Sequence, residues 1–245
     1  MFDFHSHILP AMDDGSCSVE ESLAMLRQSM AQGVTGIAAT PHFHADAATP
    51  DQFLEARRQA LESLKPYLGT HTPPIRLGAE VRYYDGMSRS EEILRLRMEG
   101  TSLLLVEMPM VRWTQHMCDV LAVLNSRREI TVLLAHIERY LTLQPPDVLE
   151  RLRGHGILMQ ASGAFFLRRS TRKRAMQMLQ SGYIHVLGSD CHHAKKRPPN
   201  LGDAAAVIRK GLGAQPLMDL EGRENTLMQG TPHPLLDGSD REIPL

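Results

Sequence analysis

Short apolar runs recur along the chain, and each is bounded by glycine, proline, a polar residue or a charged residue. Runs of this length, rich in aliphatic and β-branched residues, predict buried β-strands. The first run begins at Phe2 and leads to His5 and His7. Six further strands are predicted over residues 34–40, 75–79, 102–106, 130–135, 156–161 and 184–189.

The segments between these runs carry helical spacing and signals for helix ends. Ser18 and Glu21 match a capping box, and Gly33 supplies the stop of the same helix. Thr49 and Gln52 match a second capping box. Helices are therefore predicted over residues 18–32, 49–68, 115–128, 146–153 and 171–180.

Strands that alternate with helices predict an α/β fold with a parallel sheet and right-handed crossovers. Seven such units in 245 residues predict a (β/α)7 TIM-like barrel, one unit short of the usual eight. We expect residues 1–245 to form a single domain. From about residue 230 the chain has prolines, glycines and little periodicity, which predicts an extended tail.

Composition narrows the class of function. Lys and Arg number 27 against 28 Asp and Glu, so the net charge of -1 gives no bulk electrostatic case for nucleic acid or an anionic membrane. The three cysteines are irregularly spaced, which favours neither a disulfide framework nor a thiolate zinc site. We find no signal peptide and no run of membrane-spanning length, and we expect a cytoplasmic protein without membrane insertion.

Six of the seven runs lead to a histidine or a carboxylate. These residues are His5, His7, His42, Glu80, Glu107, His136, Asp190 and His192. A barrel of parallel strands carries its active site at the carboxyl ends of the strands, so these side chains are expected to converge. Imidazole and carboxylate ligands without thiolates suit Mn²⁺, Fe or Zn²⁺ in sites that keep positions open for substrate. The remaining run ends at Gln160 and Ser162, without a charged ligand.

Each of these residues also has an ordinary explanation. An isolated His-x-His pair such as His5 and His7 is as often solvated, and a lone glutamate at a strand end more often forms a salt bridge. These explanations must be invoked separately at every strand. One shared metal site explains all six strand ends together.

Ordered motifs from residue 3 to about residue 200 carry a family resemblance. They are His5-Ser6-His7, Asp13-Asp14-Gly15, Thr40-Pro41-His42, Gly78-Ala79-Glu80, Ala135-His136-Ile137-Glu138-Arg139-Tyr140, Ser189-Asp190-Cys191-His192 and Arg197-Pro198-Pro199. This set resembles the CpsB/YwqE-type protein-tyrosine phosphatases of the PHP (polymerase and histidinol phosphatase) superfamily. The resemblance implies a distorted seven-stranded barrel that holds three divalent ions, most often manganese.

The resemblance also implies a ligand set for each ion. The first ion would be held by His5, His7, Glu80 and Asp190. The second would be held by Glu80, as a bridge, with Glu107 and His136. The third would be held by Asp14, His42 and His192. Spacing alone does not choose between Asp13 and Asp14 as the ligand. If Asp14 is the ligand, Asp13 is expected to contact one of the other ligands from behind.

Two arginines follow the motifs closely. Arg139 lies three residues beyond His136, and Arg197 lies five beyond His192. A guanidinium forms bidentate, permanently charged hydrogen bonds to phosphate, so we predict both at the rim of the cluster. The implied substrate is a tyrosine-phosphorylated protein, by resemblance the tail of a bacterial tyrosine autokinase in capsule or exopolysaccharide biosynthesis.

Three other interpretations have distinct signatures. Cys191 and Arg197 have the Cys-x5-Arg spacing of cysteine-dependent phosphatases, but the intervening segment lacks glycine and contains the expected ligand His192. A small-molecule phosphoesterase, such as a histidinol-phosphate phosphatase, would use the same cluster. A non-catalytic metal-binding regulatory module would have lost ligands.

A separate basic cluster lies near a predicted helix start and is either a solvated face or a docking surface for an anionic protein segment. It consists of Arg168, Arg169, Arg172, Lys173 and Arg174.

Overall fold

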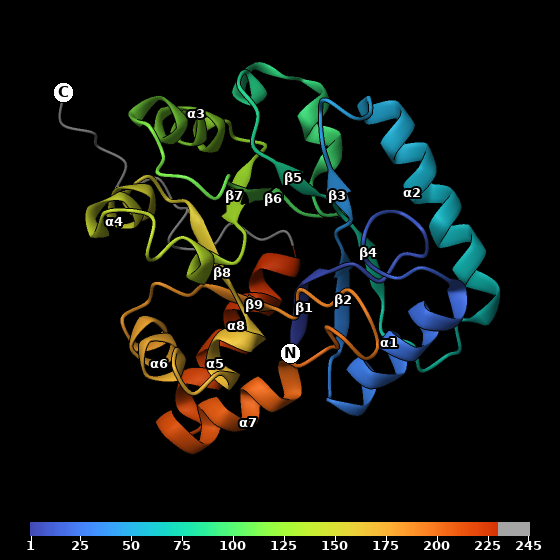
Figure 1. The fold of residues 1–245 in the computed structure, drawn as a ribbon. Helices are drawn as coiled ribbons and strands as arrows, with labels where there is room; N and C mark the ends of the chain where they lie inside the picture. Colours follow the sequence, from blue (N-terminus) through green and yellow to red (C-terminus); the bar gives the residue numbers. More distant parts are fainter. Residues whose placement is uncertain (230–245) are drawn as a thin grey trace.

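The computed structural model describes residues 1–229 of the chain. Nine parallel strand segments lie at its centre, and helices surround them (Figure 1). The strands are β1 (Phe2–Ser6), β2 (Gly36–Ala39), β3 (His42–Phe43), β4 (Ile75–Leu77), β5 (Glu80–Arg82), β6 (Leu103–Glu107), β7 (Thr131–Leu134), β8 (Leu158–Ser162) and β9 (Val186–Gly188). All seven predicted runs contain a strand, and the predicted α/β class and parallel pairing are confirmed.

The strands form two hydrogen-bonded ladders rather than one sheet of seven. The first has the order β1-β2-β4, and the second has the order β3-β5-β6-β7-β8-β9. The predicted count of seven is not observed because β3 and β5 lie beyond the predicted runs 34–40 and 75–79, separated from β2 and β4 by breaks at Thr40–Pro41 and at Gly78–Ala79. Proline has no backbone N–H for a ladder. Hydrogen bonds nevertheless cross the breaks, since Gly78 donates to Ala39 and Glu80 donates to Pro41.

The first and last strands lie next to each other. Ser6 and Cys191 form a parallel bridge, and the backbone N–H of Asp190 donates to the carbonyl of His5 over 2.7 Å. The side chain of buried Asp3 accepts a hydrogen bond from the Ser189 N–H at 2.8 Å. The edge strand β1 of the first sheet therefore lies against the edge strand β9 of the second, which brings residues from both ends of the sequence to one site.

Eight α-helices and four short 3₁₀ segments accompany the strands in the part of the chain described. The helices are α1 (Val19–Ala31), α2 (Pro50–Leu64), α3 (Gln115–Ser126), α4 (Pro146–Gly154), α5 (Gly163–Leu167), α6 (Arg172–Gln180), α7 (Leu201–Leu212) and α8 (Gln215–Met228). The 3₁₀ segments are η1 (Lys65–Tyr67), η2 (Met87–Arg89), η3 (Glu92–Leu96) and η4 (Ile137–Arg139). All five predicted helices are present, whereas α5, α7 and α8 were not predicted.

The helix caps follow the sequence signals with one exception. Thr49 and Gln52 exchange both hydrogen bonds of a capping box, and Gly33 ends the first helix with a φ of 77°. Ser18 accepts from the Glu21 N–H as predicted. The Glu21 carboxylate, however, accepts from the Cys17 N–H instead of the Ser18 N–H, so the first predicted box is only half formed.

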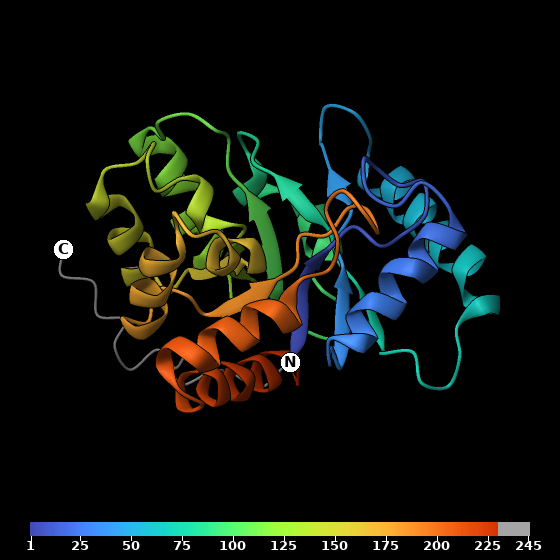
Figure 2. The same ribbon diagram turned by 60° about the horizontal axis from the view of Figure 1, so that its bottom comes forward.

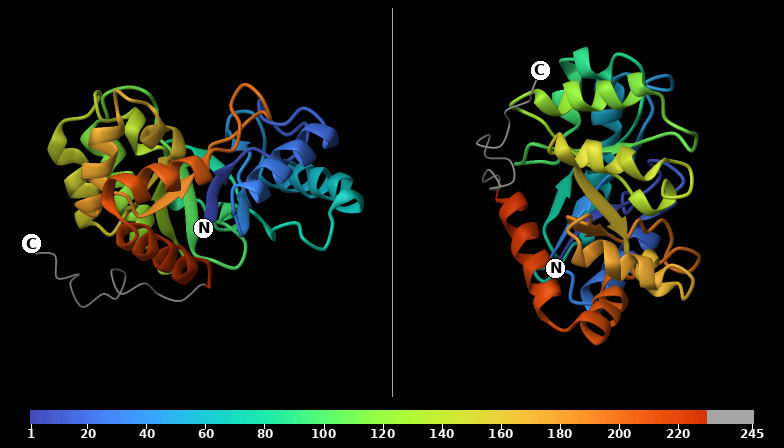
Figure 3. Two further views of the ribbon diagram at one scale, coloured as in Figure 1. Left: turned by 90° about the horizontal axis from the view of Figure 1, so that it is seen from below. Right: turned by 90° about the vertical axis from the view of Figure 1, so that its left-hand side faces the viewer.

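Helix α8 lies beside the amino-terminus, packed against β1 and β9 (Figure 3). Its buried Glu224 accepts hydrogen bonds from the N–H groups of Phe2 and Leu187. Helix α7 packs beside α8, and the loop after β9 meets the loop between β1 and α1 on the other side of the strands (Figure 2). Among residues 1–229, no helix has the length and apolar character needed to cross a membrane. The predicted tail from about residue 230 lies outside the described residues.

Candidate metal centre

The nine predicted ligands come from six strands and one loop. His5 lies in β1, His42 in β3, Glu80 in β5 and Glu107 at the end of β6, whereas His7, His136, Asp190 and His192 follow strand ends and Asp14 lies between β1 and α1. Most of these side chains are buried, while Asp14 is exposed. The structure brings all nine side chains together at one end of the strands.

The first group consists of four donor atoms, one each from His5, His7, Glu80 and Asp190. His5 Nε2 lies 3.0 Å from Glu80 Oε2 and 3.6 Å from Asp190 Oδ1. His7 Nε2 lies 3.3 Å from the same Glu80 oxygen and 3.1 Å from His5 Nε2. Four ligand-type atoms at such separations define one small coordination volume.

The second group uses the other oxygen of Glu80. His136 Nε2 lies 2.9 Å from Glu80 Oε1 and 3.5 Å from Glu107 Oε1. His42 Nδ1 lies 3.1 Å from Glu80 Oε2, the oxygen that also faces His5 and His7. The two oxygens of Glu80 therefore face two different groups, as a bridging ligand requires.

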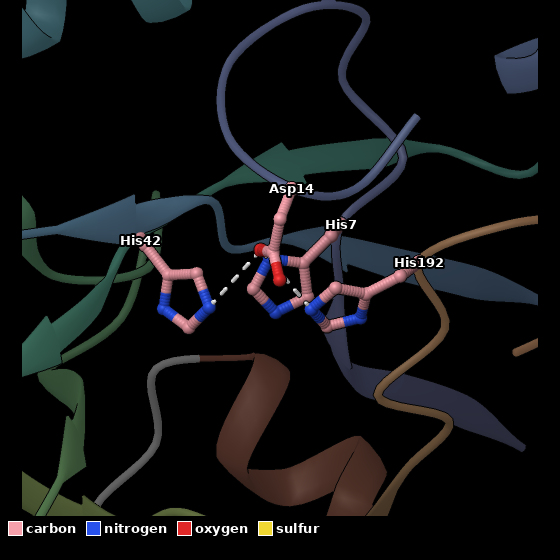
Figure 4. Close-up of side chains that lie close together, drawn as sticks. All are labelled: His7, Asp14, His42 and His192. Atoms are coloured by element: carbon pink, nitrogen blue, oxygen red, sulfur yellow. Dashed lines mark ion pairs between the residues drawn. The ribbon is translucent and has the colours of Figure 1, made fainter. Parts of the chain in front are cut away.

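The third group has exposed Asp14 between two imidazoles (Figure 4). Asp14 Oδ1 lies 3.5 Å from His42 Nε2 and 3.5 Å from His192 Nε2. The side chain of His7 lies beside them, and one potential ligand atom from each of the four residues lies within 4.8 Å of the others. This group is the most open of the three.

Asp13 takes a different position from Asp14. Its Oδ2 lies 2.7 Å from His7 Nδ1 and accepts the backbone N–H of His42 at 2.8 Å. The contact leaves His7 Nε2 directed at the cluster, because the two ring nitrogens point in opposite directions. Asp13 thus lies behind the imidazole, where a carboxylate orients a ligand and raises its basicity.

Gln160 on β8 supports the cluster and was not identified from the sequence. Its Oε1 lies 3.2 Å from His5 Nδ1 and accepts the His136 N–H at 2.7 Å. The strand predicted to contribute no charged ligand therefore contributes a neutral amide. Its oxygen contacts the ring of His5 and the backbone of His136. The signal available was a buried polar residue in the run 156–161, but glutamine is not a common ligand type.

Two of the residues lie in strained backbone conformations. His136 has φ of 31° and Asp190 has φ of 51°, in the left-handed region that side chains other than glycine avoid. Each turns the chain sharply at the end of its strand. Strain of this kind costs roughly 1–3 kcal/mol and is concentrated at functional sites.

The electrostatics of the cluster favour positive charge at its centre. Burial opposes ionisation of Glu80, but His5, His136 and His7 hold its pKa well below the ordinary value. Burial alone would lower the pKa of His7, yet Asp13 and Glu80 raise it to about 10. Burial likewise opposes the charged form of His136, but Glu107 and Glu80 raise its pKa to about 9. A divalent cation supplies the same charge and competes with these protons.

Two further imidazoles, those of His42 and His192, are suited to ligation as they stand. Burial, together with the neighbouring His7 and Arg197, lowers the pKa of His192 to about 4. Burial also lowers the pKa of His42. Neutral imidazole is the metal-binding form, so these residues need lose no proton near neutral pH.

Asp190 links the cluster to both predicted arginines. Its Oδ1 faces the histidines, while Oδ2 accepts from Arg139 Nη2 at 2.5 Å and from Arg197 Nη2. Burial favours the protonated form, but His5 and the two arginines lower the pKa of Asp190 to about 2. Both arginines therefore lie beside the cluster, in contact with Asp190.

Two cavities open beside the cluster. The larger, about 710 Å³, includes Asp14, His42 and Glu107 in its lining, together with apolar groups such as Met12 and Ala47. The other, about 420 Å³, lies on the side of Arg139 and Arg197. A ligand bound at the cluster therefore has space on two sides.

Cys191 cannot serve as a nucleophile in this conformation. The residue is fully buried, and burial with the nearby Asp3 raises the pKa of its thiol. The thiolate, not the thiol, is the nucleophilic form. Its spacing to Arg197 is therefore not the signature of a thiolate phosphatase. Imidazole and carboxylate groups converge at the neighbouring cluster instead, and this combination fits divalent metal ions.

Residues 1–226 match the sequence model of a family described as capsular polysaccharide synthesis, CpsB/CapC. The chain belongs to the CpsB/CapC family. Among its relatives, tyrosine-protein phosphatase YwqE of Bacillus subtilis (strain 168) is 27% identical over 248 residues, covering 96% of each chain. Tyrosine-protein phosphatase CpsB of Streptococcus pneumoniae is 31% identical and covers 90% of this chain and 94% of that protein.

The fold of this CpsB/CapC member also matches a solved relative. That chain comes from crystal structures of YwqE from Bacillus subtilis and CpsB from Streptococcus pneumoniae, described there as unique metal-dependent tyrosine phosphatases. The TM-score is 0.80 at 26% identity, and the match covers 94% of this chain and 95% of the other. The match therefore spans nearly the whole length of both chains.

Proposed function

We propose that this chain is a metal-dependent protein-tyrosine phosphatase that hydrolyses phosphotyrosine in proteins. The observation that carries the proposal is the convergence of nine histidine and carboxylate ligands with two arginines at one strand-end site. The family membership and the printed names of the relatives support it.

We assign three divalent ions to the cluster, with manganese as the expected metal and iron or zinc as alternatives. The three groups described above correspond to the three ions, with Glu80 shared between the first two. The donor set supports the assignment, because it combines imidazole with carboxylate and contains no thiolate.

The remaining parts of the proposal concern context. We propose that the two ladders together form a distorted seven-stranded barrel of the PHP type, within a single domain. The expected location is the cytoplasm. The expected partner is a tyrosine-phosphorylated protein, the tail of a bacterial tyrosine kinase in capsule or exopolysaccharide biosynthesis, and the capsular description of the family supports this choice.

The side chains divide the chemical work. Divalent ions, when bound, lower the pKa of water and neutralise phosphoryl oxygens as charge develops. Arg139 and Arg197 present guanidinium groups to the phosphate and keep it at the rim of the cluster. Asp13 and Gln160 fix the orientation of His7 and His5 through the ring nitrogens that face away from the centre.

A phenolic substrate suits a site without an obvious general acid. The phenol of tyrosine has a pKa of about 10, so it leaves with less proton assistance than an alkoxide. The cavity of about 710 Å³ beside Asp14, His42 and Glu107 has apolar groups in its wall and offers space to an aryl group. Both features favour an aryl phosphate over a small alkyl phosphate.

The test is phosphate release from a phosphotyrosine peptide in the presence of Mn²⁺. We expect release that stops on chelation and falls at least 100-fold in His136→Ala, because His136 contacts both Glu80 and Glu107. Cys191→Ala is the matched control, and we expect it to retain metal and activity because its thiol is buried and un-ionised.

Three results would contradict the proposal. Activity that survives chelation, or that survives His136→Ala, would exclude the metal mechanism. Loss of activity in Cys191→Ala with its metal retained would restore the thiolate mechanism. Faster turnover of histidinol phosphate than of the phosphotyrosine peptide would instead indicate a small-molecule phosphoesterase.

A further inference from the structure

A basic pocket lies beside the cluster on the side of α5 and α7. Its volume is about 420 Å³, and its lining includes Arg139, Ser162, Arg168, Lys196 and Arg197. We call this cavity the basic pocket. It begins at the two arginines that border the cluster and extends away from it, so its outer part is separate from the metal ligands.

The charge of the basic pocket is only partly balanced by its own acids. Asp190 is engaged by Arg139 and Arg197. The other acid in the wall, Glu138, accepts the backbone N–H of Ser162. Among residues 1–229, Arg168 and Lys196 have no acidic side chain within ion-pair distance. Two cations in the outer part of the pocket are therefore available to an anion.

A buried hydroxyl in the wall also lacks a partner. Ser162 is 4% exposed, and its Oγ forms no hydrogen bond with any group in the described part of the chain. A buried hydroxyl without a hydrogen bond is destabilising, so such groups normally have a partner. An oxyanion in the pocket would accept a hydrogen bond from this hydroxyl.

The neighbouring basic residues do not share this arrangement. Arg172 is used within the fold, where it donates to the carbonyls of Phe166 and Leu167. Arg169 and Lys195 are exposed but do not line the pocket. The pocket thus selects Arg168 and Lys196 from a larger basic surface, and it supplies matched controls next to each in sequence.

We propose that the basic pocket binds a second oxyanion of the substrate segment, a carboxylate side chain or a second phosphate close to the phosphotyrosine. This inference rests on the proposed phosphatase function. Arg168 and Lys196 supply the charge, and Ser162 supplies a hydrogen bond. Residues of an extended segment advance about 3.3–3.6 Å each, so a residue within three positions of the phosphotyrosine reaches a pocket that starts at the cluster rim.

The experiment compares phosphotyrosine peptides with Mn²⁺. One peptide has alanine at the three positions on either side, and in the others glutamate or phosphoserine replaces one alanine at a time. We expect the best acidic peptide to exceed the alanine peptide roughly tenfold in kcat/KM, as two partly exposed ion pairs would give. The preference should fall as salt rises, because the added contacts are electrostatic.

Variants locate the preference in the basic pocket. We expect Arg168→Ala combined with Lys196→Ala to reduce the ratio between acidic and alanine peptides to roughly twofold or less, whereas Arg168→Lys retains most of it. Arg169→Ala and Lys195→Ala are the controls and should keep both the ratio and the activity on the alanine peptide. Ser162→Ala should lower the ratio two- to threefold without loss of thermal stability, because it removes an unpaired hydroxyl.

The outcomes separate this inference from the proposed function. Equal kcat/KM for all peptides, or a preference that survives the double variant, overturns the basic pocket and leaves the phosphatase intact. No release from any peptide overturns both. Preference for phosphoserine alone identifies a second phosphate, preference for glutamate alone identifies a carboxylate, and preference for both identifies a general oxyanion site.

Discussion

Adjacent aspartates illustrate how one residue type takes two roles. Asp14 is exposed and faces His42 and His192, whereas Asp13 is largely buried and contacts His7 from behind. Two backbone N–H groups and His7 hold the pKa of Asp13 far below its ordinary value, against the opposing effect of burial. Asp13 is therefore a permanent anion whose contact fixes a neighbouring imidazole.

Replacing Asp13 tests this positioning role. We expect Asp13→Asn to lower the affinity for Mn²⁺ roughly 10–100-fold, because the amide no longer stabilises positive charge on His7. The measurement is calorimetric titration of metal into chelator-treated protein. Exposed Asp46 offers a control, and Asp46→Asn should titrate like the unaltered chain. Equal affinities for all three proteins would show that Asp13 is structurally neutral.

The convergence of the nine residues was predictable because their residue types are unusual at the ends of apolar runs. Histidine and glutamate at such positions need compensation, and six coincidences point to one cause. The orienting residues were not predictable in the same way. Gln160 carries no charge, and only its contact with His5 in three dimensions gives it a role. The choice of Asp14 over Asp13 came from the motif, not from spacing.

At the scale of elements, β9 must approach β1 closely. Gly188 lies where a Cβ atom would be 2.5 Å from the Cβ of His5 and 2.8 Å from Gln160 Nε2. The contact with His5 cannot be relieved by rotation of its side chain, since the atom there is its Cβ. The glycine therefore permits the position of His5 in the cluster.

Replacing Gly188 should disturb stability and metal binding together. We expect Gly188→Ala to destabilise the fold by about 1–3 kcal/mol and to reduce metal content, because the overlap displaces His5. Urea denaturation and elemental analysis measure the two effects. Gly222 in α8 has no atom within 4 Å of its would-be Cβ, and Gly222→Ala should instead stabilise by about 0.5–1 kcal/mol. Full metal content in Gly188→Ala would contradict the packing argument.

Helix α8 introduces a pH dependence through Glu224. Burial raises the pKa of this carboxyl from 4.5 to about 8, although the N–H groups of Phe2 and Leu187 oppose the shift. The folded chain thus holds this proton more tightly than the unfolded chain. Its contribution to stability is complete below pH 4.5 and is lost as pH rises towards 8.

Glu224→Gln should remove that loss, because glutamine stays neutral. We compare the free energy of unfolding of the variant with that of the unaltered chain. From pH 5 to pH 9 we expect this difference to shift in favour of the variant by on the order of 3 kcal/mol. Urea denaturation of chelated protein at both pH values measures the change. Asp219→Asn, an exposed change on the same helix, should follow the unaltered chain. Parallel pH profiles for Glu224→Gln would refute the linkage.

The sequence predicted the long, well-capped helices and missed three others for physical reasons. Helix α5 has five residues, too few for a period to register. Helix α7 buries alanines such as Ala204 and Ala205, whose small side chains give a weak apolar pattern. Helix α8 buries Glu224, a residue that a hydrophobic pattern assigns to the surface. The short strands β3 and β5 were also missed, because they begin beyond the predicted runs 34–40 and 75–79 and have only two and three residues.

At the scale of the whole molecule, bound ions should stabilise the native fold. Ligands that bind only the folded chain add about 2.7 kcal/mol each at 100 times their Kd. We therefore expect Mn²⁺ to raise the unfolding temperature relative to chelated protein, by several degrees or more. Thermal denaturation followed by circular dichroism checks this, and His136→Ala should show a smaller rise. An unchanged midpoint would argue against a resident metal centre.

The meeting of β1 and β9 has a consequence for how the chain folds. The contact between Asp3 and Ser189 joins positions 186 residues apart, and the first coordination group depends on the same closure. Contacts of such long sequence separation form late and slow the folding reaction. A nascent chain would therefore acquire high metal affinity only after its last strand has been synthesised and docked. The onset of metal uptake during synthesis would then mark the moment at which the fold is complete.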